Sequence, residues 1–207
     1  MIIGILALQG AFEEHEKIFN KIDPKIKTIL IKKQEDVEIC DGVVLPGGES
    51  TSMSFLEKDI FQAVREHINK KKPVWGTCAG MILLANNIVG KIEGQKNIGG
   101  LDITIHRNFF GSQLNSFISP LNYPSQFNKK GTFPAVFIRG PVIMKIGSDV
   151  SVLNVLDSGC IVSVQQENIL GTSFHPELTN DNSWHEYFIE LIKKYLSRFK
   201  DIKDFQM

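Results

Sequence analysis

Short apolar runs alternate with amphipathic segments along the first hundred residues of the chain. Four continuous apolar runs have the length and pattern of strands that are buried on both faces of a sheet: residues 2–8, 26–31, 41–45 and 73–76. Apolar side chains recur at helical spacing from Met53 to Ile68, and residues 81–88 are predicted to form a further helix. Strands and helices that alternate with short connections predict an α/β fold, with a mostly parallel central sheet flanked by helices.

The pattern changes after Gly99 and Gly100. Residues 108–133 are rich in Asn, Ser, Gln, Phe and Pro, which predicts a long loop region. Apolar side chains from Trp184 to Phe199 predict an amphipathic closing helix. Five short runs predict strands with little helix between them: residues 101–105, 135–138, 152–156, 161–164 and 170–174. With no internal repeat and no linker, we expect one domain over residues 1–207.

Composition narrows the class of protein. Hydrophobic residues make up 43% of the 207 residues and charged residues 22%, as in soluble folded proteins. Lys and Arg number 23, as do Asp and Glu, so the chain lacks the basic surplus of a protein that binds nucleic acid or an anionic membrane. Three widely spaced cysteines form no disulfide framework and no CxxC pair, and no apolar run is long enough to span a membrane. We therefore expect a cytoplasmic protein with no metal site and no bound cofactor.

The segment Gly76-Thr77-Cys78-Ala79-Gly80 carries the clearest chemical signal. A nucleophile flanked by glycines, between a predicted strand and a predicted helix, is typical of a nucleophile elbow. A Cβ atom at either glycine position would crowd so tight a turn, and the start of the following helix favours a thiolate. The alternative is a buried structural cysteine, which is common for free cysteines. The strand–turn–helix context favours Cys78 as the nucleophile.

A thiol nucleophile needs a base, and the base needs a carboxylate to orient it. Among the five histidines, His175 ends an apolar strand, and the carboxyl ends of parallel strands are where such sheets place their sites. Glu177 lies two residues later, with a proline between them, and can reach His175. For the other four histidines we expect other roles: a local hydrogen bond at a strand end for His106, surface or capping positions for His15 and His67, and an exposed position for His185.

The third candidate element is a glycine turn at residues 45–51, again between a predicted strand and a helix. Free backbone N–H groups in such a turn can stabilise an oxyanion or hold a carboxylate. The alternative is an ordinary turn in which Ser50 or Thr51 caps the helix. Taken alone, the turn does not decide between the two.

These segments together resemble the triad class of glutamine amidotransferases, and within it the glutaminase subunits of pyridoxal 5′-phosphate synthase. Three motifs carry the resemblance to the class, in this order along the chain: residues 46–51 (PGGEST), 76–80 (GTCAG) and 174–178 (FHPEL). Further segments narrow it to the subunit: residues 8–10, 99–102, 107–108, 111–113 and 137–139. The similarity runs nearly from end to end of the chain, and it implies the fold of the class I amidotransferases.

The resemblance implies roles for individual residues. It makes Cys78 the nucleophile, and His175 and Glu177 the rest of a catalytic triad. The amides of Gly48 and Ala79 correspond to the oxyanion hole. Glutamine presents an α-carboxylate, which arginine can bind bidentately, and an α-ammonium, which a glutamate or carbonyl groups can bind. The matching glutamine-binding positions are Gly48, Glu49, Ser50, Arg107, Ile138 and Arg139.

The activity implied is hydrolysis of L-glutamine to glutamate and ammonia, with the ammonia passed to a barrel-shaped synthase subunit that builds pyridoxal 5′-phosphate. Three alternatives remain at this point: a glutaminase for another synthase such as that of histidine biosynthesis, a free-standing cysteine hydrolase or peptidase, and a non-catalytic scaffold of the same fold. The chain departs from the family pattern where Ser112 replaces a frequent Arg, where Gly140 replaces a frequent Ala, and over the divergent residues 122–133. These departures affect loop conformation and contacts with a partner.

Overall fold

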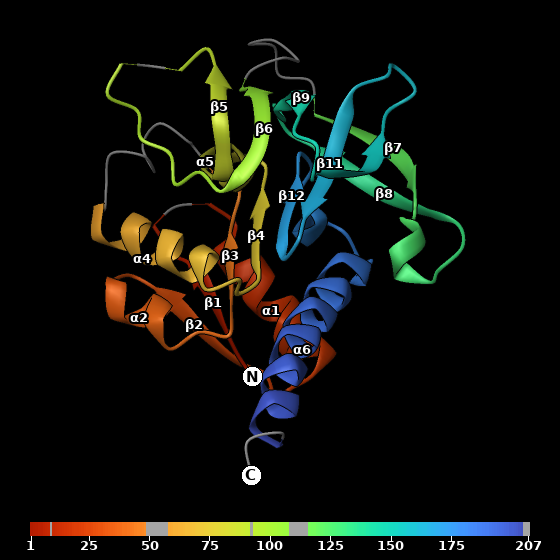
Figure 1. Cartoon of the computed structure of the whole chain (residues 1–207). Coiled ribbons are helices and arrows are strands. Elements are labelled where there is room, and N and C mark those ends of the chain that lie inside the picture. Colours follow the sequence, from red (N-terminus) through yellow and green to blue (C-terminus); the bar gives the residue numbers. More distant parts are fainter. Residues whose placement is uncertain (9, 49–57, 92, 108–115, 205–207) are drawn as a thin grey trace.

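The fold is a large sheet with helices on both sides (Figure 1). The computed structural model describes residues 1–8, 10–48, 58–91, 93–107 and 116–204, with side chains as far as residue 198. In this part of the chain, ten strands form one sheet and two more form a separate hairpin. The predicted α/β class with a central sheet flanked by helices is confirmed. The single domain over residues 1–207 stays a prediction.

Half of the sheet is parallel and follows the strands predicted from the apolar runs. In spatial order it contains β2 (Lys27–Ile31), β1 (Ile2–Leu6), β3 (Gly42–Leu45), β4 (Val74–Thr77) and β12 (Ile169–Thr172). The register pairs Leu45 with Gly76 and Thr172 with Thr77. The carboxyl ends of β3, β4 and β12 therefore lie level with one another at one edge, where the segments that follow them meet.

Two cores cover the two faces of this parallel half. Side chains alternate along each strand, so Val43 and Leu45 pack on one face while Val44 packs on the other. The first face is covered by α2 (Gln34–Glu38), α4 (Lys58–Asn69) and α5 (Ala79–Leu84), and the second by α1 (Phe12–Ile22) and α6 (Ser183–Asp204). Figure 1 shows the two groups of helices on opposite sides of the strands. The predicted closing helix is confirmed as α6.

The other half of the sheet is built mostly from antiparallel pairs. Beyond β12 it contains β11 (Ile161–Gln166), β10 (Ser151–Val155), β9 (Val142–Ile146), β6 (Leu101–His106) and β5 (Ala85–Val89). Among these described strands, β5 and β6 pair in parallel and the other pairs are antiparallel. The hairpin contains β7 (Phe117–Asn122) and β8 (Thr132–Phe137), joined through the short 3-10 helix η1 (Ser125–Phe127).

Two predictions about this region are wrong. The helix expected over residues 81–88 ends at Leu84, and the chain continues as β5 because that segment finds a partner in β6. The long loop expected over residues 108–133 contains β7 and the start of β8, and residues 108–115 lie outside the described part. Pro120, one of the prolines that suggested a loop, faces Pro134 in this two-stranded sheet. Proline is tolerated on such edges because its missing N–H is not needed there.

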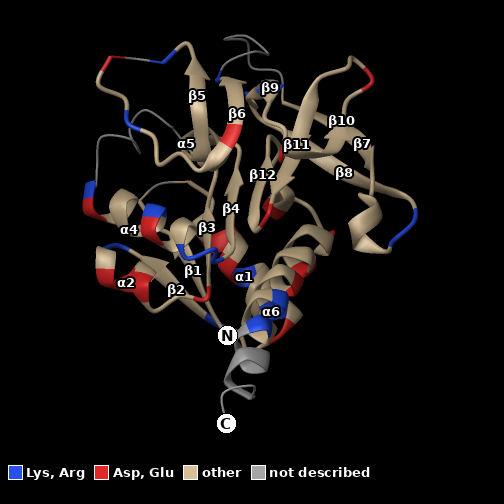
Figure 2. Ribbon diagram, in the orientation of Figure 1, with Lys and Arg blue, Asp and Glu red and all other residues tan. Residues whose placement is uncertain are grey.

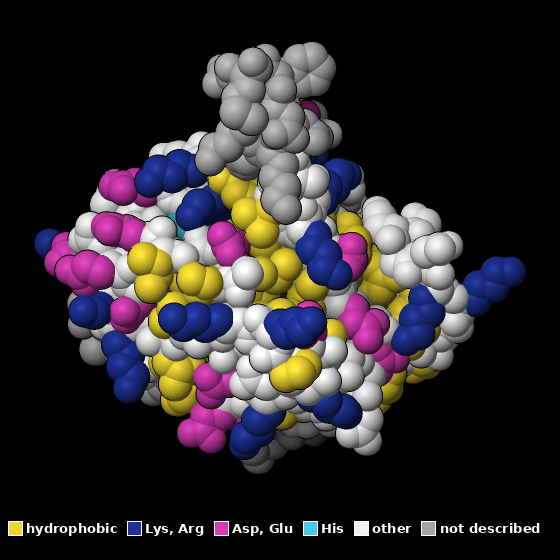
Figure 3. Space-filling model, turned by 90° about the horizontal axis from the view of Figure 1, so that it is seen from below, with side chains coloured by type: hydrophobic (Ala, Val, Ile, Leu, Met, Phe, Trp, Pro, Cys, Tyr) yellow, Lys and Arg dark blue, Asp and Glu magenta, His cyan; other side chains and the backbone are white. Residues whose placement is uncertain are grey.

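Charged side chains of both signs share the surface. Figure 2 shows them mainly on helices and loops, with few on the central strands. On the face seen from below, Lys and Arg alternate with Asp and Glu, and apolar groups lie between them (Figure 3). Among the described residues, no helix is long and apolar enough to cross a membrane.

Candidate active site

Cys78 occupies a strained turn between β4 and α5. Its backbone has φ of 46° and ψ of −106°, a left-handed conformation that is uncommon for a residue other than glycine. A Cβ atom on Gly80 would lie 1.8 Å from the carbonyl oxygen of Leu45, and one on Gly76 would lie 2.6 Å from the carbonyl carbon of Gly80. Gly80 is therefore required for the turn to pack against β3, and Gly76 for it to pack against the start of α5, and the predicted elbow geometry is confirmed.

Backbone hydrogen bonds bring the end of β12 to the elbow. The N–H of Cys78 donates to the carbonyl of Thr172 at 2.7 Å, and the N–H of His175 donates to the carbonyl of Val136 at 2.8 Å. The Cys78 thiol interacts with the His175 imidazole and raises its pKa. A Cβ on Gly47 would lie 2.3 Å from Cε1 of His175 and 3.3 Å from Cβ of Cys78. The turn after β3 thus packs directly against the thiol and the imidazole.

Glu177 completes the line of side chains. It lies in the short 3-10 helix η2 (Pro176–Leu178), and its Oε1 accepts a hydrogen bond from His175 Nδ1–H at 2.7 Å. The side chains of Cys78, His175 and Glu177 are all buried, with only His175 and Cys78 keeping a small exposed fraction. The structure therefore joins the three residues that the sequence predicts as a nucleophile, a base and an orienting carboxylate.

The electrostatics favour a charged imidazole beside the thiol. Burial alone would lower the pKa of His175, but the hydrogen bonds with Cys78 and Glu177 and the attraction of both groups outweigh it and raise the pKa to about 10. Burial alone would raise the pKa of the Glu177 carboxyl. The facing His15 and the hydrogen bond from His175 outweigh burial and hold this pKa below its usual value. At neutral pH the site therefore favours imidazolium at His175 and carboxylate at Glu177.

The two predicted oxyanion-hole residues belong to the segments next to Cys78: Ala79 directly follows it, and Gly48 follows Gly47, where an added Cβ would lie 3.3 Å from Cβ of Cys78. Ala79 is the first residue of α5, and the first N–H groups of a helix have no partner within it. Gly48 follows a turn that is tied to β4, because the N–H of Gly47 donates to the hydroxyl of Thr77 at 3.0 Å. Two predicted glutamine-binding residues that follow this turn, Glu49 and Ser50, lie outside the described residues.

The remaining predicted binding residues fall in two places. The carbonyl oxygen of Ile138, just after β8, lies 3.9 Å from Sγ of Cys78. Arg139 follows it with a left-handed φ of 49°. Arg107 comes directly after β6, and its guanidinium donates to Oε1 of Gln95 at 3.1 Å. Ile138 thus borders the thiol, with Arg139 next to it in the chain, and Arg107 is joined to Gln95.

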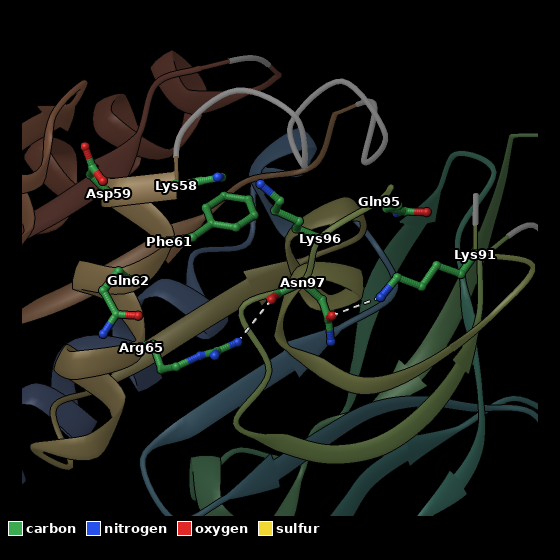
Figure 4. Close-up of a pocket in the computed structure, with 9 residues that line it drawn as sticks. All are labelled: Lys58, Asp59, Phe61, Gln62, Arg65, Lys91, Gln95, Lys96 and Asn97. Carbon is green, nitrogen blue, oxygen red and sulfur yellow. Dashed lines mark hydrogen bonds between the residues drawn. The ribbon is translucent and has the colours of Figure 1, made fainter. Parts of the chain in front are cut away.

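A pocket of about 490 Å³ lies between α4 and the segment that follows β5, as Figure 4 shows. Asn97 crosses it, with its carbonyl oxygen accepting from Arg65 at 3.2 Å and its side-chain oxygen accepting from Lys91 at 3.3 Å. None of its lining residues is a predicted site residue; they are Lys58, Asp59, Phe61, Gln62, Arg65, Lys91, Gln95, Lys96 and Asn97.

Three histidines were expected on the surface, at caps or in exposed positions, and those predictions are wrong. His15 and His185 are 0% exposed and His67 is 3% exposed. The spacing of apolar residues in this helix could have predicted the burial of His15. It lies three and four residues before Ile18 and Phe19 on one helical face, and both of these are buried. A polar residue at an apolar position of an amphipathic helix is buried with it. His106, which was expected at a strand end, is the last residue of β6.

Comparisons with known proteins agree with this geometry. The model of the SNO glutamine amidotransferase family matches residues 5–194. The pyridoxal 5′-phosphate synthase subunit PdxT of Dehalococcoides mccartyi is 44% identical over 198 residues, which cover 94% of this chain and 99% of that protein. A probable pyridoxal 5′-phosphate synthase subunit of Arabidopsis thaliana is 41% identical over 223 residues, which cover 94% of this chain and 87% of that protein.

A solved structure agrees as well. The crystal structure of a glutamine amidotransferase is 39% identical, covers 93% of this chain and 100% of its own, and superposes with a TM-score of 0.83. The motifs around residues 46–51, 76–80 and 174–178 therefore reflect a relationship that extends over the whole fold. The chain belongs to the SNO glutamine amidotransferase family.

Proposed function

We propose that this protein is the glutaminase subunit of a pyridoxal 5′-phosphate synthase, which hydrolyses L-glutamine and supplies the ammonia to a synthase subunit. One observation carries the catalytic part: a thiol at a left-handed elbow packs beside an imidazole whose Nδ1–H donates to a buried carboxylate. The names of relatives that are 41% and 44% identical support the assignment to this synthase.

The proposed reaction begins with Cys78. Its thiolate attacks the side-chain amide carbon of glutamine and forms a C–S bond, while the carbonyl oxygen takes the negative charge. His175 gives its proton to the amide nitrogen, the C–N bond breaks, and ammonia leaves behind a thioester. His175, now neutral, takes a proton from water as the water attacks the thioester, and glutamate and the thiolate are released. Glu177 holds the imidazole in the tautomer that both steps need.

Binding and transition-state stabilisation are assigned to the residues around the thiol. The amides of Gly48 and Ala79 are proposed to donate to the developing oxyanion. For the substrate, an arginine side chain suits the α-carboxylate, and carbonyl or carboxylate oxygens suit the α-ammonium. The proposed glutamine-binding residues are Gly48, Glu49, Ser50, Arg107, Ile138 and Arg139.

The proposed partner is the barrel-shaped synthase subunit, which would take the ammonia before water protonates it and removes its nucleophilicity. The proposed location is the cytoplasm, because a cysteine nucleophile must stay reduced to react. In agreement with that chemistry, Cys40, Cys78 and Cys160 are all free thiols.

The test measures glutamate release from glutamine with and without a purified synthase subunit, and follows pyridoxal 5′-phosphate formation in the same tube. We expect strong stimulation together with cofactor formation. Glutamate release without cofactor formation would point to a different synthase, such as that of histidine biosynthesis. Absence of release under both conditions would contradict the proposal and favour a scaffold. Among variants, His175→Asn should come close to abolishing release, and Glu177→Gln should have a milder effect.

A further inference from the structure

The carboxylate of Glu177 has a second oxygen that the proposed triad does not use. Oε1 accepts from His175, while Oε2 is buried and has no hydrogen-bond partner among the described residues. Nε2 of His15, from α1, is also buried without a hydrogen bond and lies 3.4 Å from Oε2, so the two atoms face each other in an electrostatic contact. A buried carboxylate oxygen without a partner is costly, and His15 is the polar side chain that the structure brings to it.

The line of polar groups continues behind His15. Its other ring nitrogen, Nδ1, lies 2.9 Å from Nε2 of His185 on α6. Trp75 stands edge-on to both imidazoles, with ring centroids 5.5 Å from His15 and 5.0 Å from His185. Phe19 lies 5.0 Å from His185 on another side. The two histidines are therefore enclosed by aromatic rings, and their polar contacts run toward Glu177.

The chemistry of the carboxylate sets the direction of every hydrogen bond in this line. A carboxylate only accepts, and a lone pair on Nε2 would repel Oε2, so the favoured tautomer of neutral His15 carries its N–H on Nε2. Nδ1 of His15 then carries a lone pair and must accept, so the N–H of His185 is on Nε2. The opposite arrangement would place the lone pair of His15 against Glu177. Each N–H in the series from His185 to His15 to Glu177 thus points toward the carboxylate.

We propose that His15, backed by His185, is a positioning residue that holds the Glu177 carboxylate in the orientation in which it receives Nδ1–H of His175. The proposal rests on the proposed glutaminase function, because it assigns His15 to the machinery of that reaction. His15 touches neither Cys78 nor the substrate and acts through Glu177. Burial lowers the pKa of His15 to about 3, against the attraction of Glu177, so His15 is a neutral donor over the working pH range.

The arrangement is not that of a metal site. Within the described parts of the chain, no three His, Cys, Asp or Glu side chains converge as metal ligands. The titratable groups facing Glu177 are His15 from α1 and His175, while His185 from α6 faces His15 and Cys78 faces His175. A positioning role for His15 therefore predicts a change in the titration of Glu177 when the N–H is removed.

The experiment compares His15→Met with His67→Met, both measured as full-length protein with its synthase partner. His67 is a matched control because it is also buried and uncharged, but it lies on α4, on the opposite face of the sheet. We expect His15→Met to lower kcat about 10- to 100-fold with KM within about twofold. Losing the donor to Oε2 raises the pKa of Glu177, so the acidic limb of the kcat/KM profile moves to higher pH. His15→Gln, which keeps a donor near the Nε2 position, should recover much of kcat.

His67→Met should lower the melting temperature without changing kcat or the pH profile. A wild-type pH profile and kcat in His15→Met, or equal effects in both variants, would overturn the proposal. If His15→Met does not fold, His185→Met carries the test, with a smaller fall of about threefold in kcat and the same direction of the acidic limb. A wild-type profile in His185→Met would then overturn the proposal.

A second readout separates this proposal from the proposed function. The rate at which iodoacetamide alkylates Cys78, followed by mass spectrometry against pH, reports the thiol–imidazole pair whatever the true substrate is. We expect the profile to shift in His15→Met and to stay unchanged in His67→Met. If the wild-type protein does not turn over glutamine, the glutaminase assignment is contradicted. If the alkylation profile of His15→Met is not shifted, the positioning role is contradicted.

Discussion

An imidazole lies on each side of Glu177, and the two differ in charge: His175, on the side of the site, is protonated, and His15, on the interior side, is neutral. On the side of the site, the pKa of His175 is raised to about 10, and on the interior side, the pKa of His15 is lowered to about 3. Both imidazoles face the same carboxylate, and both are buried. The difference arises because His175 also has Cys78 as a partner, whereas His15 has the uncharged His185 behind it.

This contrast shows how one carboxylate can serve two purposes. A buried imidazole keeps a proton only when opposite charges compensate its loss of hydration, and His175 has two such partners. His15 is fully enclosed and gives its N–H dipole, without a charge, to the same carboxylate. The site therefore keeps one mobile proton, on His175, next to the proposed nucleophile.

The largest expected effect is that of Cys78→Ala, which removes the partner on the site side. Glutamate release should fall to background, about 10⁴-fold or more. The pKa of His175 should also fall below about 10, because the interaction with Cys78 that raises it is lost. NMR titration of the imidazole measures the second effect. Cys160→Ala, which removes a partly exposed thiol elsewhere, is the control and should change neither. An active Cys78→Ala enzyme would end the proposed mechanism.

Acid should destabilise the fold through its buried neutral histidines, two of them on the interior side of Glu177 and one on the other face of the sheet. The pKa values of His15, His67 and His185 are about 3 in the fold, because burial lowers them, against about 6.5 in an unfolded chain. The unfolded chain binds more protons between these values, so stability falls as the pH drops below 6.5. Each group contributes up to about 1.4 kcal/mol per pH unit, or about 4 kcal/mol for all three.

The pKa of His175 gives the opposite sign. Its stabilisation is fully present below pH 6.5 and is lost as the pH rises toward 10. Urea unfolding should therefore show maximum stability near pH 6.5, and His67→Met should reduce the slope below that pH by about a third. A stability that stays constant from pH 6.5 to pH 5 would contradict the neutral interior.

Gly47→Ala tests the packing on the site side alone. The new Cβ would lie 2.3 Å from Cε1 of His175, so the ring must move away from its position between Cys78 and Glu177. A displacement of about 1 Å can cost about 100-fold in rate, which is the fall in kcat that we expect. Gly42→Ala is the matched control at the start of β3, the strand that leads into the turn with Gly47, since its Cβ would meet Ile192 at 2.5 Å on α6. It should lower the melting temperature and leave kcat unchanged. Equal kcat values in the two variants would contradict this account.

The smallest effect on kcat is expected for Thr172→Val, at the end of β12. Nε1–H of Trp75 donates to the hydroxyl of Thr172 at 3.2 Å, which links β4 to β12 in the core. Valine leaves that N–H unpaired, so unfolding free energy should fall by about 1–3 kcal/mol while kcat stays within about twofold. Thr172→Ser keeps the hydroxyl and should recover most of the stability. A tenfold loss of kcat in Thr172→Val would show instead that this link also positions the site.

The sequence predicted the site side better than the interior side. Cys78 was predictable because its two glycines and its strand–turn–helix context are contiguous, and His175 because it follows an apolar strand of the same parallel sheet. The proposed binding role of Ile138 was predicted only through the family resemblance, because a role of the backbone carbonyl does not depend on the side chain at that position. The contact of His15 with His185 joins two helices from positions 170 residues apart, which no local pattern contains.

The sequence by itself determined the period of the apolar residues and therefore the parallel half of the sheet, the helices α4 and α6, and the elbow. These features depend on neighbours within about ten residues, where strand and helix periods are distinct. Only the tertiary structure decided that residues 85–89 form a strand, that β7 and β8 form a hairpin, and that His15 and His185 are buried. Each of these depends on a partner that is distant in the sequence, and its free energy comes from pairing and burial that exist only once the chain has folded.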